Sequence, residues 1–292
     1  SAAVAGNKKP YNIAPMNHEL NLAFIGGGNM AGALASGLIG KRCGASDVHV
    51  VDINESTLEQ WREKGTSVAL RPDAALSGRR VWVFAVKPQV MRETVASCKP
   101  FLQPDTLIVS IAAGISSQTI SEWLGEPGRP WTRLVRCMPN TPALIGAGAT
   151  GMLALPGVSD DDKAVAQQLF RSVGEVTWVD SDESLDAVTA LSGSGPAYVF
   201  LFIEALIEGG QKLGLSAEQA RLLALGTLNG ATQLAALSPE SPATLRDRVT
   251  SKGGTTAAAL DVFKQQNFTA IVQQAMQAAY DRAADLSREF AQ

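Results

Sequence analysis

The stretch AFIGGGNMAGAL, residues 23–34, decides how the chain folds. It joins an apolar run, LNLAFIG from residue 20, to a helical segment that begins at Met30. Gly26, Gly28 and Ala31 match the pattern G-x-G-x-x-G/A: the first glycine permits a tight turn, the second admits a pyrophosphate, and the third small residue lets helix and sheet pack closely. By itself the stretch predicts either a plain strand-to-helix turn or the phosphate cradle of a dinucleotide.

The residues that follow favour the cradle. The next apolar run, VHVVDI at 48–53, brings Asp52 to the end of a second strand, where a carboxylate accepts hydrogen bonds from the adenosine ribose. The N-terminus of the intervening helix offers free N–H groups and partial positive charge to the phosphates. We expect a nicotinamide dinucleotide here. Asp52 would repel the 2'-phosphate of NADPH, so NADH is the better electrostatic fit, although Arg71 could reach in.

Further apolar runs predict a sheet. VWVFAV (81–86), LIVSIAA (107–113) and RLVRCMP (133–139) are continuous, as strands covered on both faces must be, and helical stretches separate them. MLAL (152–155) and VTWVD (176–180) predict two more strands around a helix at 160–172. The fold class is therefore α/β: a Rossmann domain at 20–181 with a mostly parallel sheet of about eight strands. We set residues 1–19 aside as a disordered or artificially added arm.

After Asp182 the strand signals stop, and the sequence predicts helices at 183–191, 196–213, 216–237, 241–249, 255–265 and 268–290. The helix at 196–213 is apolar over most of its circumference, which implies burial on nearly all sides. A second subunit is the simplest source of that cover. We therefore expect residues 182–292 to form an all-α dimerisation and substrate domain, intertwined or merely apposed in a homodimer.

Composition narrows the class of partner. A formal net charge of −3 gives no general electrostatic grip on nucleic acid. Three separated cysteines suggest neither a disulfide framework nor a metal site. We find no run of roughly 20 apolar residues and no apolar leader. The expectation is a cytoplasmic protein without metal, membrane or nucleic-acid partners.

Five further motifs are candidates for a ligand site. AVKP (85–88), SIAAG (110–114) and CMPNTP (137–142) follow predicted strands and ring one crevice, although the first and third could be plain turns. SGSGPAY (192–198) and TSKGGTT (250–256) open helices and present N–H and O–H donors that suit a carboxylate. Simple capping by Ser194 and Thr255 explains them equally well.

Taken in order, IGGGNM, AVKP, SIAAG, RCMPNTPA, SGSGPAY and TSKGGTT resemble the motifs of pyrroline-5-carboxylate reductase, the enzyme that makes proline, from Leu20 to about Phe290. The resemblance implies interlocking helical domains, often a ring of dimers, and reduction of L-1-pyrroline-5-carboxylate to L-proline by NADPH or NADH. Carried over by motif, the cofactor would contact Gly26, Gly28, Asn29, Met30, Ala85, Val86, Lys87, Pro88, Ala112, Asn140 and Pro196. The substrate would contact Ser251, Gly253, Gly254, Thr255 and Thr256.

Two residues depart from the family pattern. Lys252 stands where the motif usually has proline, which loosens the loop and adds positive charge near a carboxylate site. Asp52 stands where members commonly carry serine or threonine, which puts the choice of cofactor in doubt.

Reduction of a protonated cyclic imine needs alignment more than acid–base machinery. His18 and His49 are the only histidines, and both lie in the cofactor half. We expect the Thr256 hydroxyl to hydrogen-bond the imine nitrogen as the catalytic contact, and the backbone of 251–255 to hold the carboxylate.

Two other functions fit the motifs. One is a hydroxyacid dehydrogenase of similar build, with Lys212 or Lys252 as the base. The other is a nicotinamide-binding regulatory module with a degenerate substrate site. Turnover of pyrroline-5-carboxylate, of short 3-hydroxy acids, or of neither separates the three.

Overall fold

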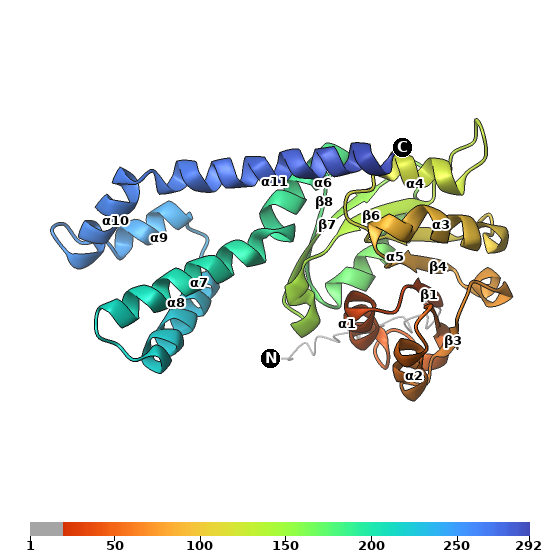
Figure 1. Cartoon of the computed structure of the whole chain (residues 1–292), viewed down its shortest axis with the longest axis horizontal. Helices are drawn as coiled ribbons and strands as arrows, with labels where there is room; N and C mark the ends of the chain where they lie inside the picture. Colours follow the sequence, from red (N-terminus) through yellow and green to blue (C-terminus); the bar gives the residue numbers. More distant parts are fainter. Residues whose placement is uncertain (1–19) are drawn as a thin grey trace, which may run out of the picture.

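The first half of the chain forms one sheet with helices on both faces (Figure 1). The computed structural model describes residues 20–292, so the arm expected at 1–19 lies outside the described residues. The strands are β1 (Leu22–Ile25), β2 (Val48–Val51), β3 (Ser67–Ala69), β4 (Val81–Phe84), β5 (Leu107–Ser110), β6 (Leu134–Met138), β7 (Gly148–Ala154) and β8 (Gly174–Trp178). The helices among them are α1 (Asn29–Leu38), α2 (Glu55–Glu63), α3 (Pro88–Cys98), α4 (Ser117–Leu124) and α5 (Asp160–Arg171).

The strand order is β3-β2-β1-β4-β5-β6-β7-β8, and the first six of these strands run parallel. The prediction of a mostly parallel sheet of about eight strands is confirmed. β7 runs antiparallel to β6 because only about nine residues join the two strands, too few for a crossover helix. β8 then pairs in parallel with β7. The three-residue edge strand β3 is too short to stand out as an apolar run.

Alternation along each strand divides the core into two layers. Leu22 and Phe24 of β1 belong to the cluster that packs under α1, α2 and α5, whereas Ala23 and Ile25 belong to the cluster under α3 and α4. All four residues of β1, β2, β4 and β5 are buried. This two-sided cover is the reason that the strands read as continuous apolar runs.

The second half is a helical arm that leaves the sheet and returns to it (Figure 1). It comprises α6 (Asp182–Val188), α7 (Gly195–Lys212), α8 (Ala217–Leu237), α9 (Pro242–Arg248), α10 (Thr255–Gln265) and α11 (Phe268–Phe290). α7 to α10 extend away from the sheet, and α11 runs back so that the C-terminus lies beside α4. A π-helical turn at Thr189–Gly193 joins α6 and α7 into one helical run, where the sequence suggests two helices.

The arm buries very little of its own apolar surface. α7, α9 and α10 contain no buried residue, and Phe200 and Leu201 of α7 are 64% and 67% exposed. The run 182–212 is long and apolar enough to span a membrane, although the sequence analysis found no apolar run of that length. One such helix is weak evidence for a membrane span, because length and composition alone define it. An exposed apolar surface of this extent marks a site of interaction with another protein chain or a membrane.

Candidate active site

The glycine turn has the geometry of a phosphate cradle. Gly26 has φ +97°, and a Cβ there would lie 2.4 Å from the carbonyl oxygen of Ala85, so only glycine fits. A Cβ at Gly28 would meet nothing within 4 Å, which leaves open space at the N-cap of α1. No side chain caps that helix. The first N–H groups of α1, near the exposed Asn29 and half-buried Met30, are therefore available to an anion.

Gly27, which the sequence pattern treats as a variable position, is equally constrained. Its N–H donates to Oδ2 of Asp52 at 2.9 Å, and its carbonyl accepts from Nε1 of Trp61 at 2.9 Å. A Cβ on Gly27 would lie 2.6 Å from that Trp61 nitrogen. The turn is thus held from β2 and from α2 at once. The run of three consecutive glycines is the signal that points to Gly27, whereas nothing local marks Trp61.

Asp52 lies at the end of β2, as predicted, and its carboxylate accepts two backbone N–H groups. Oδ2 accepts from Gly27, and Oδ1 accepts from the N–H of Asn54 at 2.9 Å. The carboxylate is half-buried. These two bonds fix its direction, and each oxygen keeps a further acceptor site for a ribose hydroxyl.

The AVKP residues follow β4 directly beside the glycine turn. The N–H of Ala85 donates to the carbonyl of Ile25 at 2.8 Å, which joins the ends of β4 and β1. Val86 is half-buried, Lys87 is exposed at the N-cap of α3, and Pro88 opens that helix. The structure therefore brings this loop together with the glycine turn at one edge of the sheet, as predicted. The same residues also form a regular helix start, so their contact with a cofactor stays a prediction.

The next two loops lie along the same edge. Ala112 is buried, and its N–H donates to Oγ of Ser110 at 3.3 Å. Asn140 donates to the carbonyl of Ser192 at 3.0 Å and accepts from the N–H of Ala149 at 2.8 Å. Its amide thus joins the loop after β6 to β7 and to the π-helical turn. Asn140 thus has a structural role, and its position beside the nicotinamide stays a prediction.

Pro196 lies in the first turn of α7, immediately after the π-helical turn. Ser194 has helical backbone angles and makes no side-chain cap, so the capping interpretation of this motif is wrong. The hydroxyl of Tyr198 instead donates to the carbonyl of Ala190 at 2.7 Å across the wide turn. π-Helical turns within helices are frequent at functional sites.

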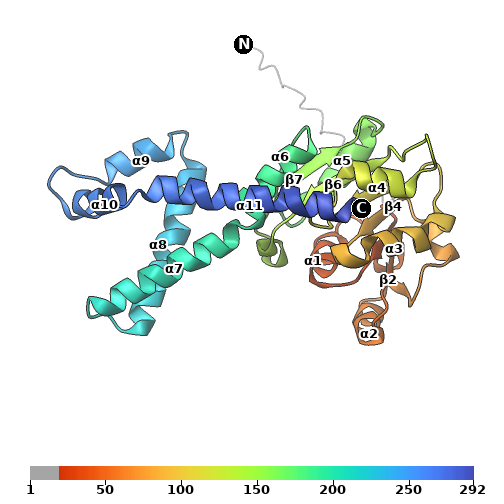
Figure 2. The same ribbon diagram turned by 45° about the horizontal axis from the view of Figure 1, so that its top comes forward.

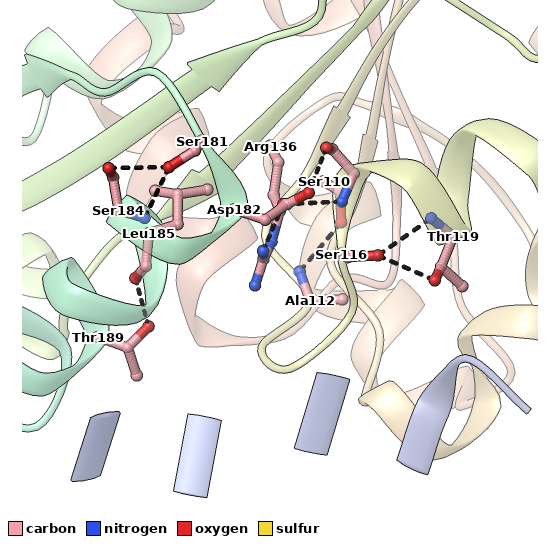
Figure 3. A network of polar contacts seen from close by, with 11 residues as sticks. Ser110, Ala112, Ser116, Thr119, Arg136, Ser181, Asp182, Ser184, Leu185 and Thr189 are labelled. Carbon is pink, nitrogen blue, oxygen red and sulfur yellow. Dashed lines mark hydrogen bonds and ion pairs between the residues drawn. The ribbon is translucent and has the colours of Figure 1, made fainter. Parts of the chain in front are cut away.

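A polar cluster that the sequence analysis missed holds the base of the arm to the sheet (Figure 3). Arg136 of β6 is 2% exposed, and its Nη1 lies 2.7 Å from Oδ1 of Asp182 at the start of α6. The same carboxylate accepts the N–H and the hydroxyl of Ser117, at 2.9 and 2.7 Å, at the start of α4. An arginine inside the apolar run RLVRCMP is a readable signal, since a buried charge must be paired.

Asp186 lies one helical turn beyond Asp182 and, unlike the partly exposed Asp182, is buried. Its Oδ1 has no hydrogen-bond partner among the described residues. Burial raises the pKa of the Asp186 carboxyl, an effect that the nearby charge of Arg136 opposes.

The substrate motif lies at the far end of the arm. Gly254 is the N-cap of α10 and no side chain caps the helix, so capping by Thr255 is also wrong. Gly253 has φ +74°, Ser251 and Thr255 are exposed, and Thr256 is half-buried. Between this loop and the sheet runs α11, whose 23 residues span about 35 Å. Figures 1 and 2 both show α9 and α10 at the end of the arm that lies far from β1 and α1, the two elements that flank the glycine turn.

Within one subunit, therefore, the structure gathers the predicted cofactor residues and leaves the predicted substrate residues apart from them.

Among residues 20–292 there is no group of three or more metal-ligating side chains. His49 lies in β2, where burial lowers its pKa, and its Nδ1 pairs with Oγ of Ser67 at 2.7 Å. A glycine turn of this geometry on a doubly wound sheet, joined to helices with open apolar faces, is characteristic of oxidoreductases of the Rossmann class.

Comparisons with known proteins identify the family. A family model described as pyrroline-5-carboxylate reductase dimerisation matches residues 182–286, and one described as NADP oxidoreductase, coenzyme F420-dependent, matches residues 21–114. Pyrroline-5-carboxylate reductase from Pseudomonas aeruginosa is 44% identical, over 93% of this chain and 98% of the relative. The enzyme from Pisum sativum is 38% identical, over 93% and 98%. The chain belongs to the pyrroline-5-carboxylate reductase family.

Solved structures agree with this assignment. A pyrroline-5-carboxylate reductase from Coxiella burnetii has a TM-score of 0.84 and 38% identity, over 91% of this chain and 98% of that chain. The pyrroline carboxylate reductase of Plasmodium falciparum, with NADP bound, has a TM-score of 0.79 and 29% identity, over 92% and 99%. The resemblance drawn from six motifs, the two-part fold and the class of NAD(P)H-dependent reductase are confirmed.

Proposed function

We propose that this chain reduces L-1-pyrroline-5-carboxylate to L-proline with NAD(P)H, at a site shared between two subunits. The observation that carries the shared site is the separation of the cofactor cradle from loop 251–256 along α11. In a dimer, the substrate loop of one subunit can lie beside the cofactor cradle of the other, because each subunit carries both half-sites. The open apolar face of α7 is the natural contact surface for that copy.

The cofactor half of the site holds a dinucleotide by its phosphates. The uncapped N-terminus of α1 and the space beside Gly28 suit a pyrophosphate, and Asp52 offers acceptors to the adenosine ribose. When bound, NAD(P)H supplies the hydride. The loops at Ala85–Pro88, Ala112 and Asn140 lie along the same edge and would align the nicotinamide.

The substrate half of the site is the N-terminus of α10. Its first N–H groups have no side-chain cap, so they are free to hold the carboxylate of the substrate. Thr256 would donate its hydroxyl to the imine nitrogen and orient it for hydride addition. A single hydrogen bond to a charged group contributes roughly 1.5–3 kcal/mol, so Thr256→Ala should lower kcat/KM about ten- to a hundredfold.

The finer organisation is part of the same proposal. Residues 20–181 form the dinucleotide-binding domain, and residues 182–292 form the dimerisation and substrate domain. The dimer is intertwined, since each arm must reach the partner's sheet edge, and dimers assemble further into a ring. We place the enzyme in the cytoplasm, without nucleic-acid or membrane partners; self-association, rather than a bilayer, covers the apolar run at 182–212.

A hydroxyacid dehydrogenase is the second candidate. Lys252 is exposed beside the uncapped start of α10, so it is positioned to serve as a base there, whereas Lys212 ends α7 at the outer turn of the arm. A nicotinamide-dependent assay with pyrroline-5-carboxylate and with short 3-hydroxy acids decides between the two reactions. A chain that binds the dinucleotide and turns over neither substrate would be the regulatory module.

Subunit complementation tests the shared site. Gly28→Asp abolishes the cofactor half, because the carboxylate would occupy and charge the pyrophosphate space, yet the open surroundings of Gly28 let the variant fold. Thr256→Ala impairs the substrate half. Each variant alone has low catalytic activity. When the two variants are dissociated, mixed and reassociated, they form mixed dimers that each hold one intact site.

Random mixing should restore about one quarter of wild-type activity, because half of the dimers are mixed and each carries one good site of two. The control is a mixture of Gly28→Asp with the double variant Gly28→Asp/Thr256→Ala, which can form no intact site. Activity that stays at the sum of the separate variants would mean that both halves come from one subunit.

A further inference from the structure

The acidic residue beside the glycine turn bears on which nicotinamide cofactor the enzyme takes. Asp52 points its carboxylate at the turn: Oδ2 lies 2.9 Å from the N–H of Gly27 and Oδ1 lies 2.9 Å from the N–H of Asn54. In a Rossmann domain a carboxylate at the end of the second strand faces the adenosine ribose and accepts hydrogen bonds from its hydroxyls. The two backbone donors leave this carboxylate little freedom to turn away from that position.

The loop after β2 offers nothing to a phosphate. Asn54 accepts the N–H groups of Ser56 and Thr57 and the hydroxyl of Ser56, so its side chain caps α2. Residue 55 is a glutamate and adds a second negative charge at the start of the helix. A 2'-phosphate placed here would meet the carboxylate of Asp52, whereas the charge of Glu55 is balanced by Arg62.

The nearby cations of α2 are directed elsewhere. Arg62 bonds Glu55 at 2.5 Å and Glu59 at 2.9 Å on the outer face of the helix. The ammonium of Lys64 lies over the ring of Trp61, 4.5 Å from its centre. Arg71 is exposed just beyond β3 and forms no ion pair with a carboxylate among residues 20–292. A single exposed guanidinium contributes little in water, so it does not offset the carboxylate of Asp52 at the end of β2.

We infer that Asp52 makes this enzyme prefer NADH over NADPH, and that the same carboxylate holds the glycine turn in its binding conformation. The inference rests on the proposed function, since it concerns the cofactor of that site. Repulsion between Asp52 and a doubly charged phosphate about 6 Å away amounts to roughly tenfold in affinity even at the dielectric constant of water. The bond to Gly27 ties this selectivity to the shape of the turn.

The double role predicts an asymmetric response to substitution. In Asp52→Ser the repulsion disappears, so NADPH gains affinity relative to NADH, although the lost bond to the Gly27 N–H acts on both cofactors. NADH binding weakens, because both the ribose acceptors and the bond to the Gly27 N–H are lost. Asp52→Asn keeps the size of the side chain but turns an N–H₂ group toward one backbone donor, so it loses charge and one of the two bonds.

The test is to measure dissociation constants of NADH and NADPH, without substrate, by energy transfer from tryptophan to the reduced nicotinamide. The wild type should bind NADH at least roughly tenfold more tightly, and Asp52→Ser should reduce or reverse that ratio by roughly tenfold. Glu63→Gln is the matched control: it removes one negative charge from the same domain, at the exposed end of α2, and should leave the ratio unchanged. Arg71→Ala should change NADPH binding by less than about twofold.

Equal or tighter binding of NADPH by the wild type, or an unchanged ratio in Asp52→Ser, would overturn the inference. A large loss of NADPH affinity in Arg71→Ala would overturn it as well. Failure of the proposed function looks different, because it leaves cofactor binding intact while pyrroline-5-carboxylate is not turned over with either cofactor.

Discussion

Replacement of Asp182 by alanine tests the cluster that joins the arm to the sheet. The carboxylate receives the guanidinium of Arg136 and both the N–H and the hydroxyl of Ser117. The side chain of Arg136 is only 3% exposed, so the substitution leaves a buried charge without its principal partner. Breaking a buried ion pair in this way typically destabilises by 3–5 kcal/mol, i.e. roughly a third of the stability of a typical domain.

Two features place the value at the lower end of that range. The carboxylate of Asp182 is itself 26% exposed, so water weakens part of the interaction. The charge of Arg136 also acts on the Asp186 carboxyl, which remains as a counter-charge after the substitution. We therefore expect Asp182→Ala to lower the free energy of unfolding by about 3 kcal/mol.

Urea denaturation followed by circular dichroism, at one fixed subunit concentration because the subunits associate, measures this loss. The control is Asp180→Ala, which removes an exposed carboxylate two residues earlier and should change stability by less than about 0.5 kcal/mol. Adding Arg136→Met to Asp182→Ala should restore part of the stability, since no buried cation is then left unpaired. A loss below about 1 kcal/mol in the single variant would refute the reasoning.

Two further substitutions probe the neighbouring groups. Burial raises the pKa of Asp186 above its ordinary 3.8, so ionisation opposes folding; Asp186→Asn should raise the urea midpoint at pH 7, with the gain fading as the pH falls towards 4. A gain that stays constant from pH 4 to 8 would contradict this. Gly27→Ala should destabilise by about 1–3 kcal/mol through its clash with Trp61, whereas Gly28→Ala should keep its melting temperature and lose cofactor affinity. The opposite order of melting temperatures would contradict the roles of the two glycines.

The fold of the first half was predictable because its signals are local. Each buried strand reads as a short apolar run, and the turn at Gly26 needs a residue that tolerates positive φ. Helix propensity likewise located the helices of the arm. The six motifs then identified the family, because spacing along a chain is visible without any knowledge of contacts.

The partners within the site were not predictable in this way. Asp52 was expected to face a ribose, but its bond to Gly27 joins residues 25 positions apart, and Trp61 reaches the same turn from 34 positions away. The ion pair of Arg136 and Asp182 joins residues that lie 46 positions apart in the sequence. No periodicity records such pairs, since a side chain's partner depends on how sheet and helices pack.

The separation of the two proposed half-sites is the clearest case of a feature that only the tertiary structure decides. The motifs at 26–31 and 250–256 look alike as helix starts rich in small residues, and both lack a side-chain cap. Sequence shows what each can bind, because free N–H groups and small residues are local properties. The distance between the two motifs depends on α11, one uninterrupted helix that holds the loop away from its own sheet. A short sequence motif carries no information about such a distance.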